Sequence, residues 1–454
     1  MPRTSPMWFV MEMAEEKRLP DELLQPPRGM RDYPPAEAGL RKKIADALCK
    51  AFELYGFQPL DTPALENWEV LSAKYAGGDE ILKETYSLKD LGDRKLGLRF
   101  DLTVPLSRFL AANSRIPLPF KRFQVGSVWR DGPIKLGRYR EFWQADADTV
   151  GAENGLADAE LVSLACDAFA SLGLNVAVRI NNRKLLDGVL ESCGVAPEQT
   201  LPAILSIDKL EKIGEKGVME ELIDERGLPV PVAEKVLKAL SMEDGLSNDE
   251  ILNKIGTTVA GSQAGRKGLK ELEEVLGYCK ALGVADRVEF LPSLARGLAY
   301  YTGTVFEVFL VAGKITSAVA AGGRYDEMIG AFSGRRLPAV GISFGADVIA
   351  DALKEKGGEA AKAGVCKVFV VPVKNPFDCL PFLQALRRAG VSAGVDLLER
   401  GISKNLEYAS KQGIPFAAII GEIEVKAGKA TLRNLASGEE KLVTAEEAAR
   451  IIRS

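Results

Sequence analysis

Two strand-like runs joined by a short turn place the tightest constraint on how this chain can fold. They cover residues 120–130 and 138–150, and Gly132 and Pro133 lie in the loop between them. Glycine and proline favour the backbone angles of turns, so the two runs are predicted to pair as an antiparallel hairpin. Successive side chains of a strand point to opposite faces of the sheet. The side chains that share one face of the second run are Arg140, Phe142, Gln144, Asp146 and Asp148.

That face combines an arginine, an aromatic ring, an amide and two carboxylates, which suits neither a hydrophobic core nor an ordinary surface. It suits a pocket for a small polar or cationic ligand beside an anionic one. Arg130 and Arg138 bracket the loop, and their planar guanidinium groups can clamp a phosphate. The alternative is a surface hairpin in which the same charges form salt bridges with one another.

The rest of the chain adds strands and helices around this hairpin. Further strand-like runs lie at 57–65, 95–103 and 288–312. Apolar residues recur with helical spacing at 36–55 and from Gly341 to about residue 353. Gly322-Gly323 indicates a turn. We therefore predict an α+β fold, in which an antiparallel sheet is flanked by helices.

Changes of pattern along the chain indicate its domain organisation. Helical segments with Lys and Glu faces replace the strands from about residue 182, and a small, charged, flexible stretch precedes a C-terminal region where strands alternate with helices. In that region we predict strands at 367–373, 394–398 and 415–420 and helices at 377–389 and 404–412. The predicted segments are an N-terminal arm (1–25), a sheet domain in two parts (26–181 and 281–353), a helical insertion (182–280), a linker (354–365) and an α/β domain (366–454).

The composition excludes several classes of protein. The 454 residues include no histidine, so the chain has no Ser-His-Asp triad, no Cys-His dyad and no zinc site with histidine ligands. The six cysteines form no C-x-x-C pair, which predicts a reducing compartment and hence the cytoplasm. No apolar stretch is long enough to span a membrane. A net charge of −4 argues against a polybasic protein whose whole surface binds nucleic acid.

Two further segments carry candidate functional residues. If residues 99–103 form a strand, Asp101 and Thr103 share a face with Arg99; a half-exposed strand with solvated charges is the alternative. Farther along, Arg296 lies among apolar neighbours just before Tyr300 and Tyr301. A buried arginine needs an anion, either a ligand or a structural carboxylate of the chain itself.

Taken together, these segments resemble the histidyl-tRNA synthetase family of class II aminoacyl-tRNA synthetases. The motifs that carry the resemblance are residues 137–144, 296–303 and 322–326, with 28–32 similar to the N-terminal signature, 57–66 to motif 1 and 338–341 to motif 3. The resemblance extends over residues 28–445 and implies a class II catalytic sheet, a C-terminal anticodon-binding domain and a homodimer.

The resemblance implies that ATP, bound with Mg²⁺, activates L-histidine, and that the histidyl group then passes to tRNA(His). It implies catalytic roles for Arg130 and Arg296 at the α-phosphate and the histidine carboxylate. Histidine would also be held by Asp101, Leu102, Thr103, Gln144, Asp148, Tyr300 and Tyr301, with Asp148 and Tyr301 at the two ring nitrogens. ATP would be bound by Arg130, Arg138, Arg140 and Phe142, with Phe142 stacked on adenine. In the C-terminal domain, the candidates for RNA contact are Glu399, Lys404 and Asn405.

Three positions depart from the family pattern: Gly132 replaces an acidic residue, Val348 replaces the motif 3 arginine and Ala299 replaces an aspartate. One alternative is therefore the catalytically inactive paralogue that regulates ATP phosphoribosyltransferase, although that paralogue lacks an anticodon-binding domain. Another is a class II synthetase for a different amino acid. Because the chain has no histidine, we also predict that the substrate imidazole causes most of the pH dependence of adenylation between about pH 5.5 and 7.5.

Overall fold

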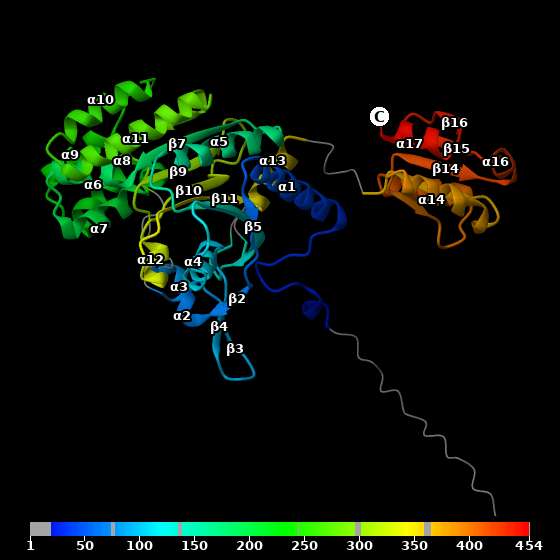
Figure 1. Ribbon diagram of the computed structural model, residues 1–454, viewed down its shortest axis with the longest axis horizontal. Helices are drawn as coiled ribbons and strands as arrows, with labels where there is room; N and C mark the ends of the chain where they lie inside the picture. The colour runs from blue at the N-terminus through cyan, green and yellow to red at the C-terminus, as the bar shows by residue number, and fades with distance from the viewer. Residues whose placement is uncertain are drawn as a thin grey trace, which may run out of the picture.

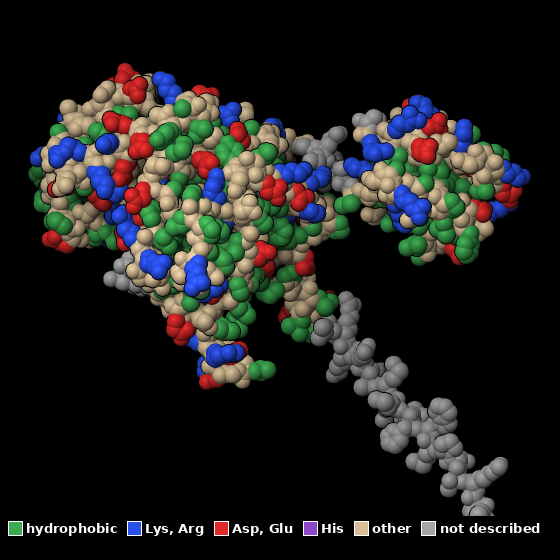
Figure 2. Space-filling view, in the orientation of Figure 1, with side chains coloured by type: hydrophobic (Ala, Val, Ile, Leu, Met, Phe, Trp, Pro, Cys, Tyr) green, Lys and Arg blue, Asp and Glu red, His purple; other side chains and the backbone are tan. Residues whose placement is uncertain are grey.

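The computed structural model describes residues 20–73, 78–134, 139–243, 245–295, 301–357 and 365–453. The first 19 residues, which make up most of the expected N-terminal arm, lie outside these ranges, as does most of the expected linker. Figure 1 shows a large body that ends at residue 357 and a smaller one that begins at residue 365. On the face seen in Figure 2, basic and acidic side chains are interspersed over both bodies, as expected for a net charge of −4.

A mixed sheet organises the large body. Within the described residues it has eight strands in the order β1-β5-β6-β11-β10-β9-β7-β8. The pairs from β5 to β7 in this order are antiparallel, as the sequence predicts, while β1 and β8 add parallel edges. The strands are β1 (Gln58–Pro59), β5 (Phe120–Trp129), β6 (Glu141–Val150), β7 (Val176–Asn182), β8 (Val288–Phe290), β9 (Thr304–Leu310), β10 (Ala320–Arg324) and β11 (Ala339–Gly345).

One face of this sheet carries the main hydrophobic core. It is packed against α1 (Pro35–Leu54), α5 (Leu156–Ser171) and α13 (Ala346–Glu355). The ring of Phe52 in α1 lies 5.4 Å from that of Phe123 in β5, and Ala145 and Ala147 of β6 belong to the same cluster. The helix predicted at 36–55 is confirmed. It ends at Leu54, and Gly56 just beyond it has a φ of +76°, which suits glycine.

On the opposite face, which we call the site face, α4 (Thr103–Ala112) and α12 (Met328–Ser333) pack together at one end. A small antiparallel sheet joins β2 (Leu65–Asn67), β4 (Lys95–Leu98) and β3 (Ser87–Lys89), near α2 (Trp68–Leu71) and α3 (Gly78–Lys83). Because strand side chains alternate between faces, the polar residues of β5, β6 and β11 that avoid the core lie on the site face.

Helices fill the chain between β7 and β8, as the sequence pattern predicts. They are α6 (Arg183–Cys193), α7 (Pro197–Ile207), α8 (Leu210–Glu220), α9 (Val230–Leu240), α10 (Asn248–Thr258) and α11 (Gln263–Ala281). Asn182 caps α6 by accepting a hydrogen bond from the backbone N–H of Lys184 at 2.9 Å. Glycines let α6 and α11 approach closely, since a Cβ at Gly188 would overlap the backbone of Gly265. The division of this region into a separate domain stays a prediction.

The smaller body is an α/β unit with the strand order β13-β12-β14-β15-β16 in its described part. The predicted strands and helices correspond to β12 (Val368–Pro372), α14 (Leu380–Arg388), β13 (Ala393–Val395), α15 (Ile402–Lys411) and β14 (Phe416–Ile420). The last elements were not predicted: α16 (Glu422–Ala427), β15 (Ala430–Asn434), β16 (Glu440–Val443) and α17 (Ala445–Arg453). None of the described helices in either body has the length and apolar character needed to cross a membrane.

Two local predictions near motif 3 are wrong. Gly322 and Gly323 form no turn but lie inside β10, where a Cβ at Gly322 would come within 2.7 Å of the Phe306 ring. The helix expected after Gly341 begins later, at Ala346, because Gly341 belongs to β11. In both cases glycine serves close packing between strands, which its turn propensity does not reveal.

Candidate active site

Cross-strand register arranges the polar side chains of the site face in rows. In one row, Asp148 of β6 lies between Arg122 of β5 and Gly341 of β11. Gly323 of β10 continues the row on the far side of Gly341. In the next row, Asp146 lies between partners from β5 and β11. The prediction that Asp146 and Asp148 share a face is therefore confirmed, and the face is the one opposite the main core.

Asp148 is oriented by two side chains, one from β5 and one from the residue that follows β10. The Tyr325 hydroxyl donates a hydrogen bond to its Oδ1, and Nη2 of Arg122 lies 2.7 Å from its Oδ2. Gly341 makes room for this carboxylate, because a Cβ there would overlap it. A Cβ at Gly323 would come within 3.0 Å of the Tyr301 ring, so Tyr301 also packs against bare backbone. Burial raises the pKa of Asp148, and the nearby Arg122 opposes this rise.

Asp146 and Gln144 follow Asp148 along the same face of β6, and Asp101 faces Asp146. Burial raises the pKa of Asp146 to about 7, against the opposing effect of Arg122, and it raises the pKa of Asp101 to about 6. Oδ1 of Asp146 and Oε1 of Gln144 are buried and have no hydrogen-bond partner among the described residues. Buried acceptors of this kind usually have a partner, so they mark a place for a ligand with N–H or O–H groups.

These carboxyl groups are a second source of pH dependence beside the substrate imidazole, and that the imidazole causes most of it stays a prediction. Asp101 and Asp146 both titrate between about pH 5.5 and 7.5, because the cost of burying a charge shifts their protonation into that range.

The segment 99–103 is not the strand that the sequence predicts. β4 ends at Leu98 and α4 begins at Thr103, so Asp101 and Thr103 do not alternate along a strand with Arg99. Oδ1 of Asp101 instead accepts a hydrogen bond from the backbone N–H of Val104 at 3.0 Å, which stabilises the first turn of α4. The side chain of Leu102 is buried, and its carbonyl oxygen accepts a hydrogen bond from Nη2 of Arg122 at 3.0 Å. The segment is thus joined to the row that contains Asp148.

Arg130 and Phe142 lie together at the other end of the hairpin. Nε of Arg130 donates a hydrogen bond to the carbonyl oxygen of Phe100 at 3.0 Å. The guanidinium carbon of Arg130 lies 5.2 Å from the centroid of the Phe142 ring. A cation and a half-buried aromatic ring are thereby placed on the same face as the carboxylates.

The turn of the hairpin is tied to two other parts of the chain. Arg140 pairs with Asp131 at 2.8 Å, and its backbone N–H donates a hydrogen bond to the carbonyl oxygen of Gly29 at 2.9 Å. The carboxylate of Glu84 fills the space that a side chain at Gly132 would need, since a Cβ there would lie 2.7 Å from its Oε1. An acidic group therefore lies beside residue 132 although that residue is glycine.

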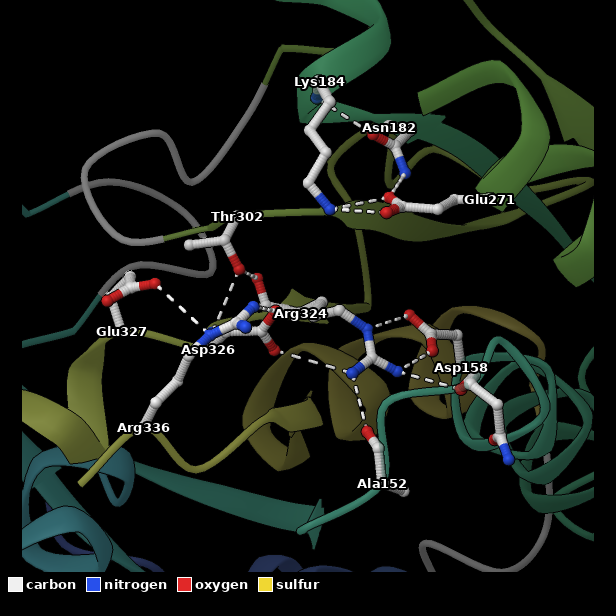
Figure 3. A network of polar contacts seen from close by, with 11 residues as sticks. Ala152, Asp158, Asn182, Lys184, Glu271, Thr302, Arg324, Asp326, Glu327 and Arg336 are labelled. Atoms are coloured by element: carbon white, nitrogen blue, oxygen red, sulfur yellow. Dashed lines mark hydrogen bonds and ion pairs between the residues drawn. The ribbon is translucent and has the colours of Figure 1, made fainter. Parts of the chain in front are cut away.

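A buried arginine secures the chain that follows Tyr301. Figure 3 shows Arg324 between Asp158, to which Nε and Nη2 donate hydrogen bonds, and Asp326, whose Oδ1 lies 3.5 Å from Nη1. The backbone N–H of Thr302 donates a hydrogen bond to the carbonyl oxygen of Arg324 at 2.8 Å. The backbone N–H of Asp326 donates to Oγ1 of Thr302 at 3.0 Å. The chain at Thr302, next to Tyr301, is thus held by strand β10 and the residues that follow it.

A cavity of about 410 Å³ lies beside Arg324 and reaches toward α6 and α11. On its helical side Lys184 pairs with Glu271 at 2.6 Å (Figure 3). The residues that line it do not include those of the row around Asp148. The cavity is therefore distinct from the candidate active site.

Several predicted site residues lie elsewhere. Arg138, Arg296 and Tyr300 fall outside the described residues. In the C-terminal unit, Glu399 and Lys404 are exposed, but the side chain of Asn405 is fully buried and donates hydrogen bonds to Asp396 and to the carbonyl oxygen of Arg400. In this structure Asn405 cannot contact RNA directly; it supports the loop that carries Glu399.

Sequence reasoning missed two residues of the site. Arg122 lies in the first run of the predicted hairpin, and Tyr325 lies in the motif at 322–326, but neither was assigned a role. Pairing the two runs residue by residue places Arg122 opposite Asp148, which is the signal that was available in the sequence.

Comparison with known proteins relates this geometry to a family. Residues 29–349 match the histidyl-tRNA synthetase family, and residues 367–454 match the anticodon-binding domain family. The chain belongs to the histidyl-tRNA synthetase family. A protein of Bacillus cereus called histidine–tRNA ligase 1 is 45% identical over 416 residues, which cover 91% of this chain and 96% of that protein.

More distant members of the histidyl-tRNA synthetase family agree. The histidine–tRNA ligase of Aeropyrum pernix is 42% identical over 433 residues, covering 94% of this chain and 97% of that protein. The crystal structure of histidyl-tRNA synthetase from Nostoc sp. PCC 7120 matches with a TM-score of 0.84 and 33% identity, covering 94% of this chain and 98% of that one. These relatives, and the anticodon-binding match, do not favour the regulatory-subunit alternative.

The departure from the family pattern at position 348 has a packing explanation. Val348 of α13 is half-buried and packs against the main core, on the opposite side of the sheet from Asp148. The neighbouring Asp347 accepts a hydrogen bond from the backbone N–H of Trp143 at 3.0 Å and pairs with Arg41 at 3.0 Å. This contact joins the start of α13 to β6.

Proposed function

We propose that this chain is a histidine–tRNA ligase that converts L-histidine and ATP to histidyl-adenylate and then transfers the histidyl group to tRNA(His). The observation that carries the proposal is the row of buried acceptors along β6, on the face of the sheet that also carries Asp148. Oε1 of Gln144 and Oδ1 of Asp146 have no hydrogen-bond partner among the described residues. Histidine offers an ammonium group and a ring N–H, which are the donors that such acceptors need.

Histidine would lie along the site face between α4 and Tyr301. Asp101, Thr103 and Gln144 would surround its ammonium group, with the backbone of Leu102 alongside. The imidazole ring would lie beside Asp148, which accepts from a ring N–H. Tyr301 and Tyr300 would complete the ring site, with the hydroxyl of Tyr301 at the second nitrogen. A pocket built on two ring nitrogens rejects side chains that lack them, because its polar groups would then be left unpaired.

The first step is an attack of the histidine carboxylate on the α-phosphorus of ATP, in which an O–P bond forms and pyrophosphate leaves. Arg130 and Arg296 would stabilise the negative charge that develops on the α-phosphate. Phe142 would stack on adenine, with Arg138 and Arg140 at the phosphates. In the second step a hydroxyl of the terminal tRNA ribose attacks the histidyl carbonyl carbon, and AMP leaves. Both steps depend chiefly on positioning and on fixed charge.

ATP would bring its Mg²⁺ with it. In the part of the chain that the structure describes, no three Cys, Asp or Glu side chains are grouped closely enough to hold a metal ion. Mg²⁺ commonly keeps several waters and binds through substrate phosphates, so the phosphates of ATP are its expected ligands here. No role proposed for the side chains above depends on the ion.

The C-terminal unit would bind the anticodon of tRNA(His). Glu399 and Lys404 are exposed on the loop after β13 and on α15, so both are available to RNA. We further propose that the chain acts as a homodimer in the cytoplasm. The boundaries proposed for the catalytic parts (26–181 and 281–353) and for the insertion (182–280) follow the change from strands to helices and back.

ATP–pyrophosphate exchange with each amino acid in turn tests the proposed function. We expect exchange with L-histidine and none above background with the others. Exchange with another amino acid would indicate a different class II synthetase. No exchange with any amino acid, from a chain with a normal unfolding transition, would support the regulatory-subunit alternative.

A further inference from the structure

Arg122 is the largest fully buried charged side chain among the described residues, and it lies in the active site rather than in the core. Its exposed fraction is 0%. Nη2 lies 2.7 Å from Oδ2 of Asp148 and donates a hydrogen bond to the carbonyl oxygen of Leu102. Nε and Nη1 have no hydrogen-bond partner among the described residues. A buried guanidinium group is very costly without a counter-charge, so the pairing with Asp148 is what allows it to be there.

This pair lies where a ligand ring would bind. Arg122 and Asp148 are direct cross-strand partners, and the next positions of the row are Gly341 and Gly323. Neither glycine has a side chain to cover the pair, and Tyr301 lies over Gly323. The pair lies on the face of the sheet opposite the main core, on the same face as the buried acceptors of Gln144 and Asp146.

Among the described residues, few other charges face Asp148. Arg122 comes from β5, Asp146 from β6 itself, and the neutral Tyr325 hydroxyl from the chain after β10. Asp101, before α4, faces Asp146 and Arg122. Asp101 is expected beside the substrate ammonium group, and burial keeps Asp146 largely protonated below its pKa of about 7. Of the described groups, Arg122 and Asp148 therefore set the charge next to the ring, and they cancel. A cationic ring placed there would lose its hydration and gain no net counter-charge.

We propose that Arg122 is a specificity-determining positioning residue, which pairs with Asp148 so that the ring site binds histidine with an uncharged imidazole and disfavours a cationic ring. The proposal rests on the proposed function. Neutral imidazole has one ring N–H and one ring acceptor. Asp148, which Arg122 and Tyr325 hold in its orientation, accepts a hydrogen bond from the ring N–H. Without Arg122 the carboxylate would be left unpaired and would attract a cation instead.

The test compares two substrates of the full-length chain in ATP–pyrophosphate exchange between about pH 5.5 and 8. One is L-histidine, and the other is an analogue with a 1,2,4-triazole ring, which stays uncharged throughout this range. Protein groups that titrate, such as Asp101 and Asp146, affect the KM values of both substrates. The ratio of the histidine KM to the analogue KM therefore isolates the protonation of the histidine ring.

For the unchanged chain we expect this ratio to rise about tenfold as the pH falls from about 8 to 5.5, because only about a tenth of the imidazole stays neutral at the lower pH. Arg122→Met and Arg122→Gln remove the charge, and in both we expect a flat or falling ratio. Arg122→Lys keeps the charge and should keep the rise. Arg179→Met is the matched control, since Arg179 pairs with Glu211 and Glu289 outside the site; its ratio should follow that of the unchanged chain.

Two results would overturn the proposal: a flat ratio in the unchanged chain, or a tenfold rise that persists in Arg122→Met or Arg122→Gln. The first requires no variant, so the proposal stays testable even if loss of Arg122 prevents folding. Absence of any histidine-dependent exchange at about pH 8 would instead refute the proposed function, and is thereby distinguished from failure of this inference.

Discussion

Replacing Asp146 by asparagine should stabilise the chain more strongly as the pH rises. Burial moves the pKa of Asp146 from an ordinary value of 3.8 to about 7. The folded chain therefore holds a proton at Asp146 that the unfolded chain has released, and stability falls as the pH rises from about 4 to about 7. A shift of about three pKa units lowers the free energy of unfolding by about 4 kcal/mol at pH 8. About 2 kcal/mol of this loss is already present at pH 5. Asparagine carries no charge and avoids the penalty.

The assay is thermal unfolding of Asp146→Asn and of the unchanged chain at several values between about pH 5 and 8. The variant should have the higher unfolding midpoint, and its advantage over the unchanged chain should roughly double from about pH 5 to 8. Asp249→Asn, at an exposed position of α10, is the matched control and should not raise the midpoint, because an exposed carboxylate carries no burial penalty. A pH-independent difference for Asp146→Asn, or a lower midpoint than the unchanged chain at about pH 8, would refute the argument that burial keeps this carboxyl protonated.

Four further changes test other parts of the structure. Gly341→Ala should destabilise the chain by about 1–3 kcal/mol and raise the histidine KM, since the new Cβ would overlap the Asp148 carboxylate. The control Gly39→Ala, in open space on α1, should stabilise the chain slightly. Equal unfolding midpoints for the two variants would contradict this prediction. Arg324→Met leaves a buried aspartate unpaired and should cost about 3–5 kcal/mol in urea unfolding, and a loss below about 1 kcal/mol would show that the network is dispensable. Arg296→Ala should slow pyrophosphate exchange by about 10²–10³ without changing the unfolding midpoint, and a loss of only a few-fold would refute its role. Deleting residues 366–454 should leave histidine-dependent exchange measurable but remove most tRNA charging, and equal loss of both would mean that the two bodies depend on each other.

Local patterns in the sequence predicted the hairpin well. The alternation from Phe142 to Asp148 places polar side chains on one face and Ala145 and Ala147 in the core, and this period of two needs no knowledge of distant residues. The helix at 36–55 was predictable for the same reason, since its apolar spacing and final glycine are local signals.

What could not be predicted depends on residues brought together from distant parts of the chain. Gly322-Gly323 has the composition of a turn, and only the ring of Phe306 and the backbone of β11 show that it is a site of close packing inside the sheet. Arg122 looks like one more basic residue until the strand register places it opposite Asp148. The segment 99–103 alternates like a strand, but Asp101 stabilises the start of a helix instead.

The bare backbone beside Asp148 limits how the substrate range of this fold can evolve. The carboxylate fits only because residue 341, far away in the gene, is glycine. Exchanging one contiguous segment with a relative of different specificity would bring in a new side chain without the matching space, and the hybrid would lose stability. A new amino acid specificity therefore requires simultaneous changes on several strands, which makes the identity of the amino acid attached to the tRNA hard to alter by stepwise mutation.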